Sequence, residues 1–271
     1  MVSHPEAARW QRFKYILFRS HSGIMPTVEI ETGLPALREL TNITKSLSPE
    51  VKLSLTEKGI DIKTVDTSHV AMLIIHMDKA AFPVYHVEPT SIGLDLEKMA
   101  SVLRLASPES QIKLSIEKER LVVKIGNITR QMTIIDPTGL HDPKIPSFSP
   151  TTTLKMKVAD ILQAIRGSES ISDAVTFVAD SALGFTIHSE GEQDKIDSHF
   201  TASDLSAFVT EEGVTKSMYP LDFLASMVKV MPVEAEVTIG FSTAYPMRAE
   251  FTFADGNGTA SFMLAPRVSE D

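Results

Sequence analysis

The 271-residue sequence contains no cysteine and no long apolar run. The first absence excludes disulfide bonds, a thiol nucleophile and a cysteine-ligated zinc site, and it fits a reducing compartment. A membrane-spanning helix needs about eighteen or more consecutive apolar residues, and the N-terminal run "YILF" is too short for the core of a signal peptide. We therefore expect no membrane segment and no secretion signal.

Basic residues are also scarce. The chain has 26 Lys and Arg against 35 Asp and Glu, which gives a formal net charge of −9. This balance disfavours nucleic acid as a partner, unless the basic residues gather on one surface. The length allows one large domain or two of average size, and an apolar fraction of 43% is enough for packed cores.

The first 24 residues differ from the rest. They carry four basic residues, Arg9, Arg12, Lys14 and Arg19, against the single acid Glu6. Strand-like alternation begins only at "MPTVEIE", from Met25. We expect residues 1–24 to be a disordered extension, or the product of a start codon assigned too early. A basic arm that touches DNA is the alternative.

From Met25 onward, alternating apolar and polar residues predict many β-strands. One hairpin is expected in residues 51–63 with its turn at 57–59, and three strands are expected in residues 111–135. Apolar residues at intervals of three and four predict helices only at 34–45, 96–106, 158–167 and 221–230. The fold class is therefore α+β.

The two halves of the chain repeat each other. "MASVLR" at 99–104 matches "LASMVK" at 224–229, and "KGIDI" at 58–62 matches "LGFTI" at 183–187, each 125 residues later. Such a repeat predicts two similar domains, each with two helices packed on antiparallel sheet. We assign residues 25–137 and 151–271 to them, and the proline-rich residues 138–150 to the connector.

Four segments resemble a known family. They are "VDTSHVAML", "HDPKIPSF", "SISDAVTF" and "YPMRAEFTFADGNGTASFMLAPR", and they resemble the DNA sliding clamps of archaea and eukaryotes, the proliferating cell nuclear antigen family. The "DPKIP" connector and the missing cysteine suggest the archaeal type, and hence a cytoplasmic protein that works at the nucleoid. The resemblance covers residues 25–267 and excludes the N-terminal extension.

The resemblance implies the DNA-clamp fold and an assembly. Three subunits would close head-to-tail into a pseudo-sixfold ring around double-stranded DNA, with the helices inside. The edge strands "NITRQMTII" and "KIDSHF" would pair between subunits. The ring would tether DNA polymerase and other replication and repair enzymes as a processivity factor, after a clamp loader has placed it on DNA. Two alternatives are a subunit of a heterotrimeric clamp, and a β-rich interaction scaffold that does not encircle DNA.

The charge of the predicted helices supports DNA inside such a ring. They carry six basic residues against the four acids Glu39, Glu97, Asp160 and Asp222, a sum of +2 in a chain of −9. The six candidate channel residues are Arg38, Lys45, Lys98, Arg104, Arg166 and Lys229. A basic residue ends every helix, which the helix dipole alone favours by roughly 0.3–1 kcal/mol each. Lys and Arg would contact phosphates without reading bases.

The resemblance also implies a surface pocket that binds a short motif with one aliphatic and two aromatic anchors. Its residues would be Val65, His69, Val70, Met72, Ile145, Pro146, Phe148, Pro246, Met263, Ala265, Pro266 and Val268. The linker would stay extended because of its prolines and apolar because it forms one wall. The alternative is a linker strapped to the sheet, with Ile145 and Phe148 in the core.

No catalytic constellation stands out. His69 and His76 fall on one predicted strand at an odd separation, so they would point to opposite faces and could not share a metal. Asp66 and His69 lack a partner nucleophile, and no phosphate-binding or dinucleotide-binding loop is present. We expect no enzyme activity, no metal and no cofactor.

Overall fold

The computed structural model describes residues 26–140, 142–211 and 213–267. The N-terminal extension predicted from the sequence lies outside the described residues. The elements of the first half are β1 (Val28–Gly33), α1 (Leu34–Lys45), β2 (Glu50–Thr56), β3 (Gly59–Val65), β4 (Ala71–Asp78), the short 3₁₀-helix η2 (Lys79–Ala81), β5 (Val84–Val87), β6 (Thr90–Asp95), α2 (Leu96–Leu103), β7 (Gln111–Glu117), β8 (Arg120–Ile125) and β9 (Ile128–Thr133).

The second half begins after η3 (Pro137–Gly139) and an extended linker. Its elements are β10 (Thr152–Lys157), α3 (Val158–Ser168), β11 (Ala174–Asp180), β12 (Gly184–Glu190), β13 (Lys195–Phe200), β14 (Ala207–Thr210), β15 (Val214–Pro220), α4 (Leu221–Lys229), β16 (Glu236–Phe241), β17 (Met247–Phe253) and β18 (Gly258–Leu264).

The helices form close to where the apolar spacing predicts them. α1 spans the predicted 34–45, whereas α2 ends at Leu103, short of the predicted Ala106. Asp95 begins α2, because its carboxylate accepts the backbone N–H of Lys98 at 2.9 Å. The Lys98 ammonium and backbone hydrogen bonds lower the pKa of Asp95.

The repeat predicted from the sequence is present in the sheets. In the first half the strands run β5-β1-β7-β8-β9 and β4-β3-β2-β6, and in the second half they run β14-β10-β16-β17-β18 and β13-β12-β11-β15. Each strand of the first half therefore has a counterpart in the same place in the second. The halves join where β18 pairs with β4 along seven residue pairs, which makes one nine-stranded sheet.

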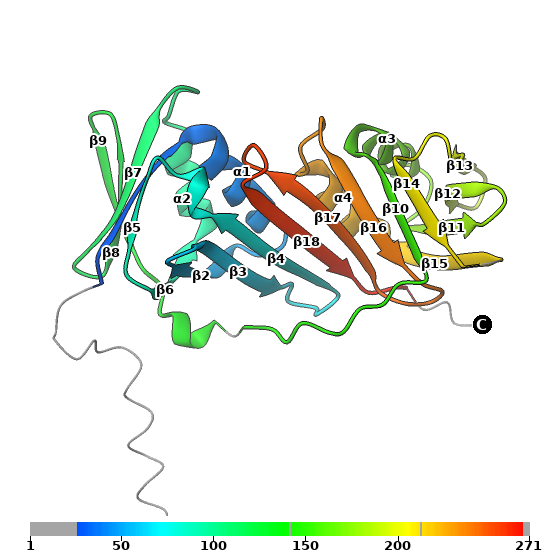
Figure 1. Cartoon of the computed structure of the whole chain (residues 1–271), viewed down its shortest axis with the longest axis horizontal. Coiled ribbons are helices and arrows are strands. Elements are labelled where there is room, and N and C mark those ends of the chain that lie inside the picture. Colours follow the sequence, from blue (N-terminus) through cyan, green and yellow to red (C-terminus); the bar gives the residue numbers. More distant parts are fainter. Residues whose placement is uncertain (1–25, 141, 212, 268–271) are drawn as a thin grey trace, which may run out of the picture.

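Helices and linker lie on opposite sides of this sheet. In Figure 1 the strands of the nine-stranded sheet face the viewer, the helices lie behind it, and the linker runs along its lower edge. α1 packs on α2 and α3 on α4. Buried Leu, Ile, Val and Phe side chains of helices and strands form one continuous core.

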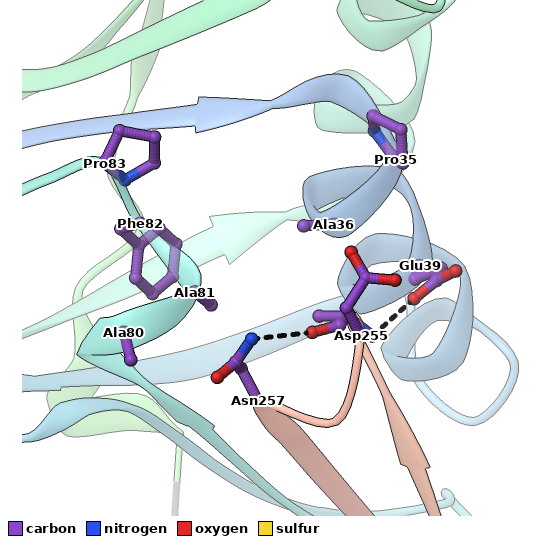
Figure 2. Close-up of a pocket in the computed structure, with 10 residues that line it drawn as sticks. Pro35, Ala36, Glu39, Ala80, Ala81, Phe82, Pro83, Asp255 and Asn257 are labelled. Atoms are coloured by element: carbon purple, nitrogen blue, oxygen red, sulfur yellow. Dashed lines mark hydrogen bonds between the residues drawn. The ribbon is translucent and has the colours of Figure 1, made fainter.

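The junction between the halves is also held behind the sheet. There the turn between β17 and β18 meets α1 and η2 around a cavity of about 350 Å³ (Figure 2). The Glu39 carboxylate accepts the backbone N–H of Ala254 at 2.7 Å, and the backbone N–H of Asp78 donates to Asn257 O at 2.8 Å. Glu39 thus fixes the turn of the other half, which explains an acid on an otherwise basic helix.

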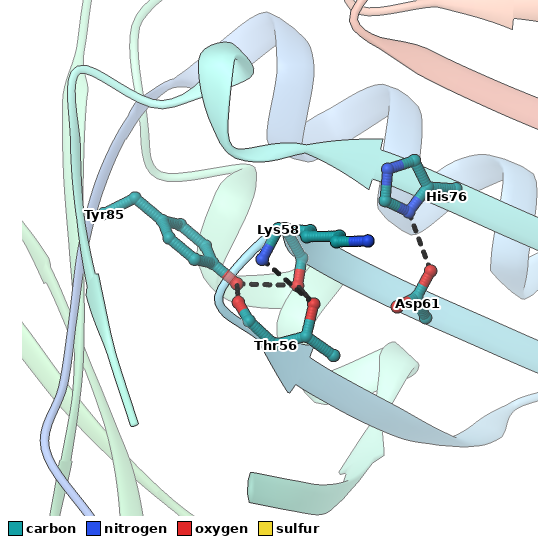
Figure 3. A network of polar contacts seen from close by, with 6 residues as sticks. Thr56, Lys58, Asp61, His76 and Tyr85 are labelled. Atoms are coloured by element: carbon teal, nitrogen blue, oxygen red, sulfur yellow. Dashed lines mark hydrogen bonds and ion pairs between the residues drawn. The ribbon is translucent and has the colours of Figure 1, made fainter. Parts of the chain in front are cut away.

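A half-buried tyrosine, Tyr85, closes one end of the first half. Figure 3 shows Tyr85 of β5 reaching the turn between β2 and β3, where its hydroxyl lies 2.9 Å from Thr56 O and 2.7 Å from Gly59 O. Burial raises the pKa of Tyr85 to about 12, so the hydroxyl stays a donor at neutral pH. The contact ties the five-stranded sheet to the nine-stranded one.

Candidate functional site

The helices turn one face inward to the core and one face outward. On α1 the buried residues include Leu34, Leu37 and Leu40, whereas Pro35, Arg38, Asn42 and Lys45 form the opposite stripe. The other three helices have the same arrangement, with Arg104, Arg166 and Lys229 exposed on their outer faces. Period-3.6 spacing therefore places the basic residues away from the sheet.

Four of the six predicted channel residues make no ion pair within the described part of the chain. They are Arg38, Arg104, Arg166 and Lys229, whereas Lys45 contacts Glu97 at 2.8 Å and Lys98 contacts Asp95 at 2.9 Å. No acid of the described residues neutralises these four cations. Two of them are equivalent in the repeat, 125 residues apart: Arg104 directly follows α2, and Lys229 is the last residue of α4.

The linker runs along one edge of the nine-stranded sheet and contacts its outer face at both ends of the linker. At one end Asp142 accepts from the Lys52 ammonium of β2 at 2.7 Å, and at the other Phe148 lies over Gly240 of β16 and stacks on Tyr245. Six residues of extended chain cover roughly 20 Å, and the five strand spacings from β2 to β16 cover roughly 24 Å. The side chains of Lys52 and Phe148 span the remaining few ångströms, so the linker backbone is close to full extension.

On the outer face, side chains from four strands form one row across the sheet. Val65 of β3 pairs with Met72 of β4, Met72 with Met263 of β18, and Met263 with Arg248 of β17. Cross-strand partners point to the same face. We call this row together with the linker residues Ile145–Phe148 the docking strip.

Two of the other predicted pocket residues adjoin the strands that carry this row, since Val70 directly precedes β4 and Ala265 directly follows β18. Val70 and Ala265 are joined by a backbone hydrogen bond of 2.9 Å, which brings the loop before β4 to the end of β18. Met263 is buried, and Val268 lies outside the described residues. The two apolar residues of the linker differ in burial, because Ile145 is 49% exposed while Phe148 is half-buried. Phe148 therefore holds the linker to the sheet, and Ile145 stays exposed.

The loop before β4 is organised by a residue whose role the sequence did not disclose. The buried Asp66 carboxylate accepts three backbone N–H groups at 2.7 Å, from Ser68, Val70 and Ala71. The loop places His69 at φ 57°, so His69 does not belong to the strand that the sequence predicted for it. An Asp followed by Thr and Ser is typical of such side-chain-to-backbone turns, and this pattern could have identified Asp66.

Replacing Asp66 by alanine is expected to loosen this loop without unfolding the chain. The change leaves three amide groups without their acceptor, and each buried unsatisfied group costs roughly 1–3 kcal/mol. Hydrogen exchange should accelerate at Ser68–Ala71 and stay slow in β12 of the other half. Asp66→Asn keeps an oxygen for Val70 and Ala71 and should recover part of the protection. Equal exchange in Asp66→Ala and the parent protein would contradict this role.

Side chains that could perform chemistry are scattered. His76 contacts Asp61 at 2.7 Å on the outer face of the sheet (Figure 3). Both side chains are half-exposed, and the cross-strand neighbour of His76 on β18 is Thr259. Within residues 26–140, 142–211 and 213–267, no three or more His, Asp or Glu side chains are grouped to hold a metal ion. None of the helices in that part is long and apolar enough to cross a bilayer.

Comparison with known proteins gives one consistent result. Residues 29–134 match the family described as proliferating cell nuclear antigen, N-terminal domain. A protein named DNA polymerase sliding clamp from Thermoplasma volcanium is 31% identical over 250 residues, which cover 90% of this chain and 100% of that protein. Another of that name, from Archaeoglobus fulgidus, is 31% identical over 87% of this chain and 96% of its own length.

Solved structures agree with the sequence relatives. The structure of A. fulgidus PCNA with the C-terminal region of FEN-1 bound superposes with a TM-score of 0.84 at 29% identity, covering 90% of this chain and 100% of that one. The matching relatives thus share the fold over nearly the whole described chain. This chain belongs to the proliferating cell nuclear antigen family of DNA polymerase sliding clamps.

Proposed function

We propose that three copies of this chain close into a ring around duplex DNA, and that the ring tethers replication and repair enzymes rather than catalysing a reaction. The basic outer faces of the four helices carry this proposal. They hold Arg38, Arg104, Arg166 and Lys229, which have no ion-pair partner among the described residues, in a chain of net charge −9. Contacts to phosphates alone would let the ring slide. Its place would be with the chromosome, in the cytoplasm of an archaeal cell.

Two free strand edges support closure of a ring. In the repeat, β9 occupies the place of β18 and β13 the place of β4, and β18 pairs with β4. Within the described chain, β9 and β13 each have a strand on one side only. Pairing β9 of one copy with β13 of the next would repeat the junction inside the chain, as a head-to-tail contact requires.

The two edges carry opposite charge. The β8–β9 hairpin, residues 120–133, holds Arg120, Lys124 and Arg130 and no acid, a sum of +3. The β12–β13 hairpin, residues 184–200, holds four acids and Lys195, a sum of −3; the acids are Glu190, Glu192, Asp194 and Asp197. Complementary charge favours pairing of β9 with β13 over pairing of β9 with β9 or of β13 with β13. One chain carries both surfaces, which favours a homotrimer over a heterotrimer.

Light scattering on the purified protein should give about three times the chain mass of 29.7 kDa at micromolar concentration. The mass should fall at high salt, because the proposed contact joins opposite charges that salt screens. A strict monomer at low salt would contradict self-assembly. It would leave the chain as one subunit of a heteromeric clamp or as a scaffold that does not encircle DNA.

We propose the docking strip as the surface that binds partner enzymes. Ile145 is exposed on the linker, Val65 pairs with Met72, and the half-buried Pro266 follows Ala265, which is hydrogen-bonded to Val70. A short apolar motif would bury its anchors among these side chains. Burying one large apolar side chain is worth roughly 1.5–3 kcal/mol, or one to two decades in affinity.

Ile145→Ser together with Pro266→Ser should weaken binding of a peptide with one aliphatic and two aromatic anchors by about tenfold or more. Calorimetry measures the affinity, and light scattering checks that the trimer persists. Val233→Ser is the matched control, since Val233 is also 49% exposed but follows α4. Unchanged affinity in an intact trimer would mean that the linker is only a strap and that partners dock elsewhere.

A further inference from the structure

The C-terminal end of the linker is surrounded by exposed apolar side chains. Eight large hydrophobic residues of the described chain are prominently exposed, and five of them lie on segments near this end: Ile145 49%, Leu183 67%, Val209 68%, Val214 59% and Tyr245 39%. The other three, Leu105, Ile128 and Val233, lie elsewhere in the fold. Scattered exposed apolar residues need no explanation, but a gathering of them marks an interaction surface.

Hydrogen bonds join these segments in sequence. The Tyr245 hydroxyl donates to Ser147 O of the linker at 3.2 Å, and the backbone N–H of Ala244 donates to Lys216 O of β15 at 3.3 Å. Two residues before Lys216 stands Val214. The backbone N–H of Ser181 donates to Gly213 O at 3.2 Å. This bond brings the β11–β12 turn, which contains Leu183, beside the start of β15.

Val209 completes the group from the other side. The backbone N–H of Glu211 donates to Thr151 O at the end of the linker, 3.2 Å away. Val209 pairs with Thr153, and Thr153 pairs with Gly240, the residue that Phe148 covers. We call Tyr245, Val209, Val214 and Leu183 the apolar patch. The patch begins at Tyr245, where the docking strip ends.

We infer that the apolar patch is a second contact for the same partner, and that it binds aliphatic side chains in the segment adjoining the docking motif. The inference rests on the proposed docking function. Continuity carries it, because Tyr245 stacks on Phe148 and belongs to both surfaces. Val214 of the patch lies on β15, the opposite edge of the four-stranded sheet from β13. It therefore stays free when β13 pairs with a neighbouring copy.

The length of the adjoining segment follows from the strand geometry. Val214 lies two residues along β15 from Lys216, about 7 Å, and the β11–β12 turn adds about one strand spacing of 5 Å. Four or five residues of extended chain cover this span. A partner motif lengthened by six residues with two leucines would thus reach Leu183.

The test compares three peptides on the full-length ring by calorimetry. One carries only the aliphatic and aromatic anchors, and the other two add a six-residue segment with two leucines before or after the motif. One extended peptide should bind about tenfold tighter than the short one. Leu183→Ser with Val214→Ser should remove this gain and leave the short peptide's affinity unchanged, while Val233→Ser should preserve both.

Each contrary result has its own meaning. If the short peptide binds and neither extension adds affinity, or if the gain survives Leu183→Ser with Val214→Ser, the second contact is wrong and the docking strip stands. If no peptide binds, the docking function fails and the inference falls with it. If light scattering shows paired rings that the double variant separates, the patch joins copies of this chain, and the inference is likewise overturned.

Discussion

Replacing Arg104, Arg166 and Lys229 by glutamate is expected to abolish stimulation of a polymerase on primed circular DNA. All three are exposed on the outer helix faces and make no ion pair within the described residues. In a ring of three the change would turn nine inward cations into nine anions. The slope of the logarithm of DNA affinity against the logarithm of salt concentration falls in magnitude by about 0.9 for each lost phosphate contact. The reversed charges would also repel the duplex.

The fold should survive this change. A cation at a helix C-terminus contributes roughly 0.3–1 kcal/mol, and the three side chains are solvent-exposed. A matched control replaces Lys58, Lys79 and Lys118 by glutamate, which alters net charge equally at exposed positions outside the four helices. The control should still support long products. Long products from the helix variant at ordinary salt would refute the channel assignment.

The fold could largely be predicted from the sequence, because local patterns determine it. Alternation in residues 51–63 depends only on neighbouring residues, and the repeat of Met99–Arg104 in Leu224–Lys229 can be found by comparing the two halves of the sequence. α2 ends three residues before the predicted boundary, since the apolar spacing of Leu96, Met99 and Leu103 extends to Ala106, beyond the last helical residue, where the neighbouring Leu105 is 57% exposed. Periodicity cannot distinguish an apolar residue in the core from one in solvent.

The site was harder to predict because it depends on contacts between distant segments. Asp142 is an ordinary linker residue until the fold brings Lys52 within 2.7 Å. Glu39 counted as one of four helix acids, yet it accepts a hydrogen bond from Ala254, 215 residues later. The apolar patch went unnoticed for the same reason, since Leu183 and Val214 become neighbours only through Ser181 and Gly213.

Reversing charge on one strand edge is expected to dissociate the ring, and reversing it on both edges of the same chain to restore it. Arg120→Glu with Arg130→Glu changes the β8–β9 hairpin from +3 to −1, against −3 on the β12–β13 hairpin. Glu190→Lys with Asp197→Lys changes the latter from −3 to +1, against +3. Like charges facing each other at an interface cost several kcal/mol, so each double variant should have the 29.7 kDa mass of a monomer.

The quadruple variant faces −1 against +1 and keeps the net charge of −9, so light scattering should again give a trimer. Mixing the two double variants should give dimers but no closed trimer. Oppositely charged edges then meet only where the two kinds of subunit alternate around the ring. In a ring of three subunits, at least one contact joins two subunits of the same kind. Reversing Lys58 and Lys79, outside both hairpins, should leave the trimer intact. If the quadruple variant stays monomeric while its hydrogen-exchange protection is native, these two edges are not what closes the ring.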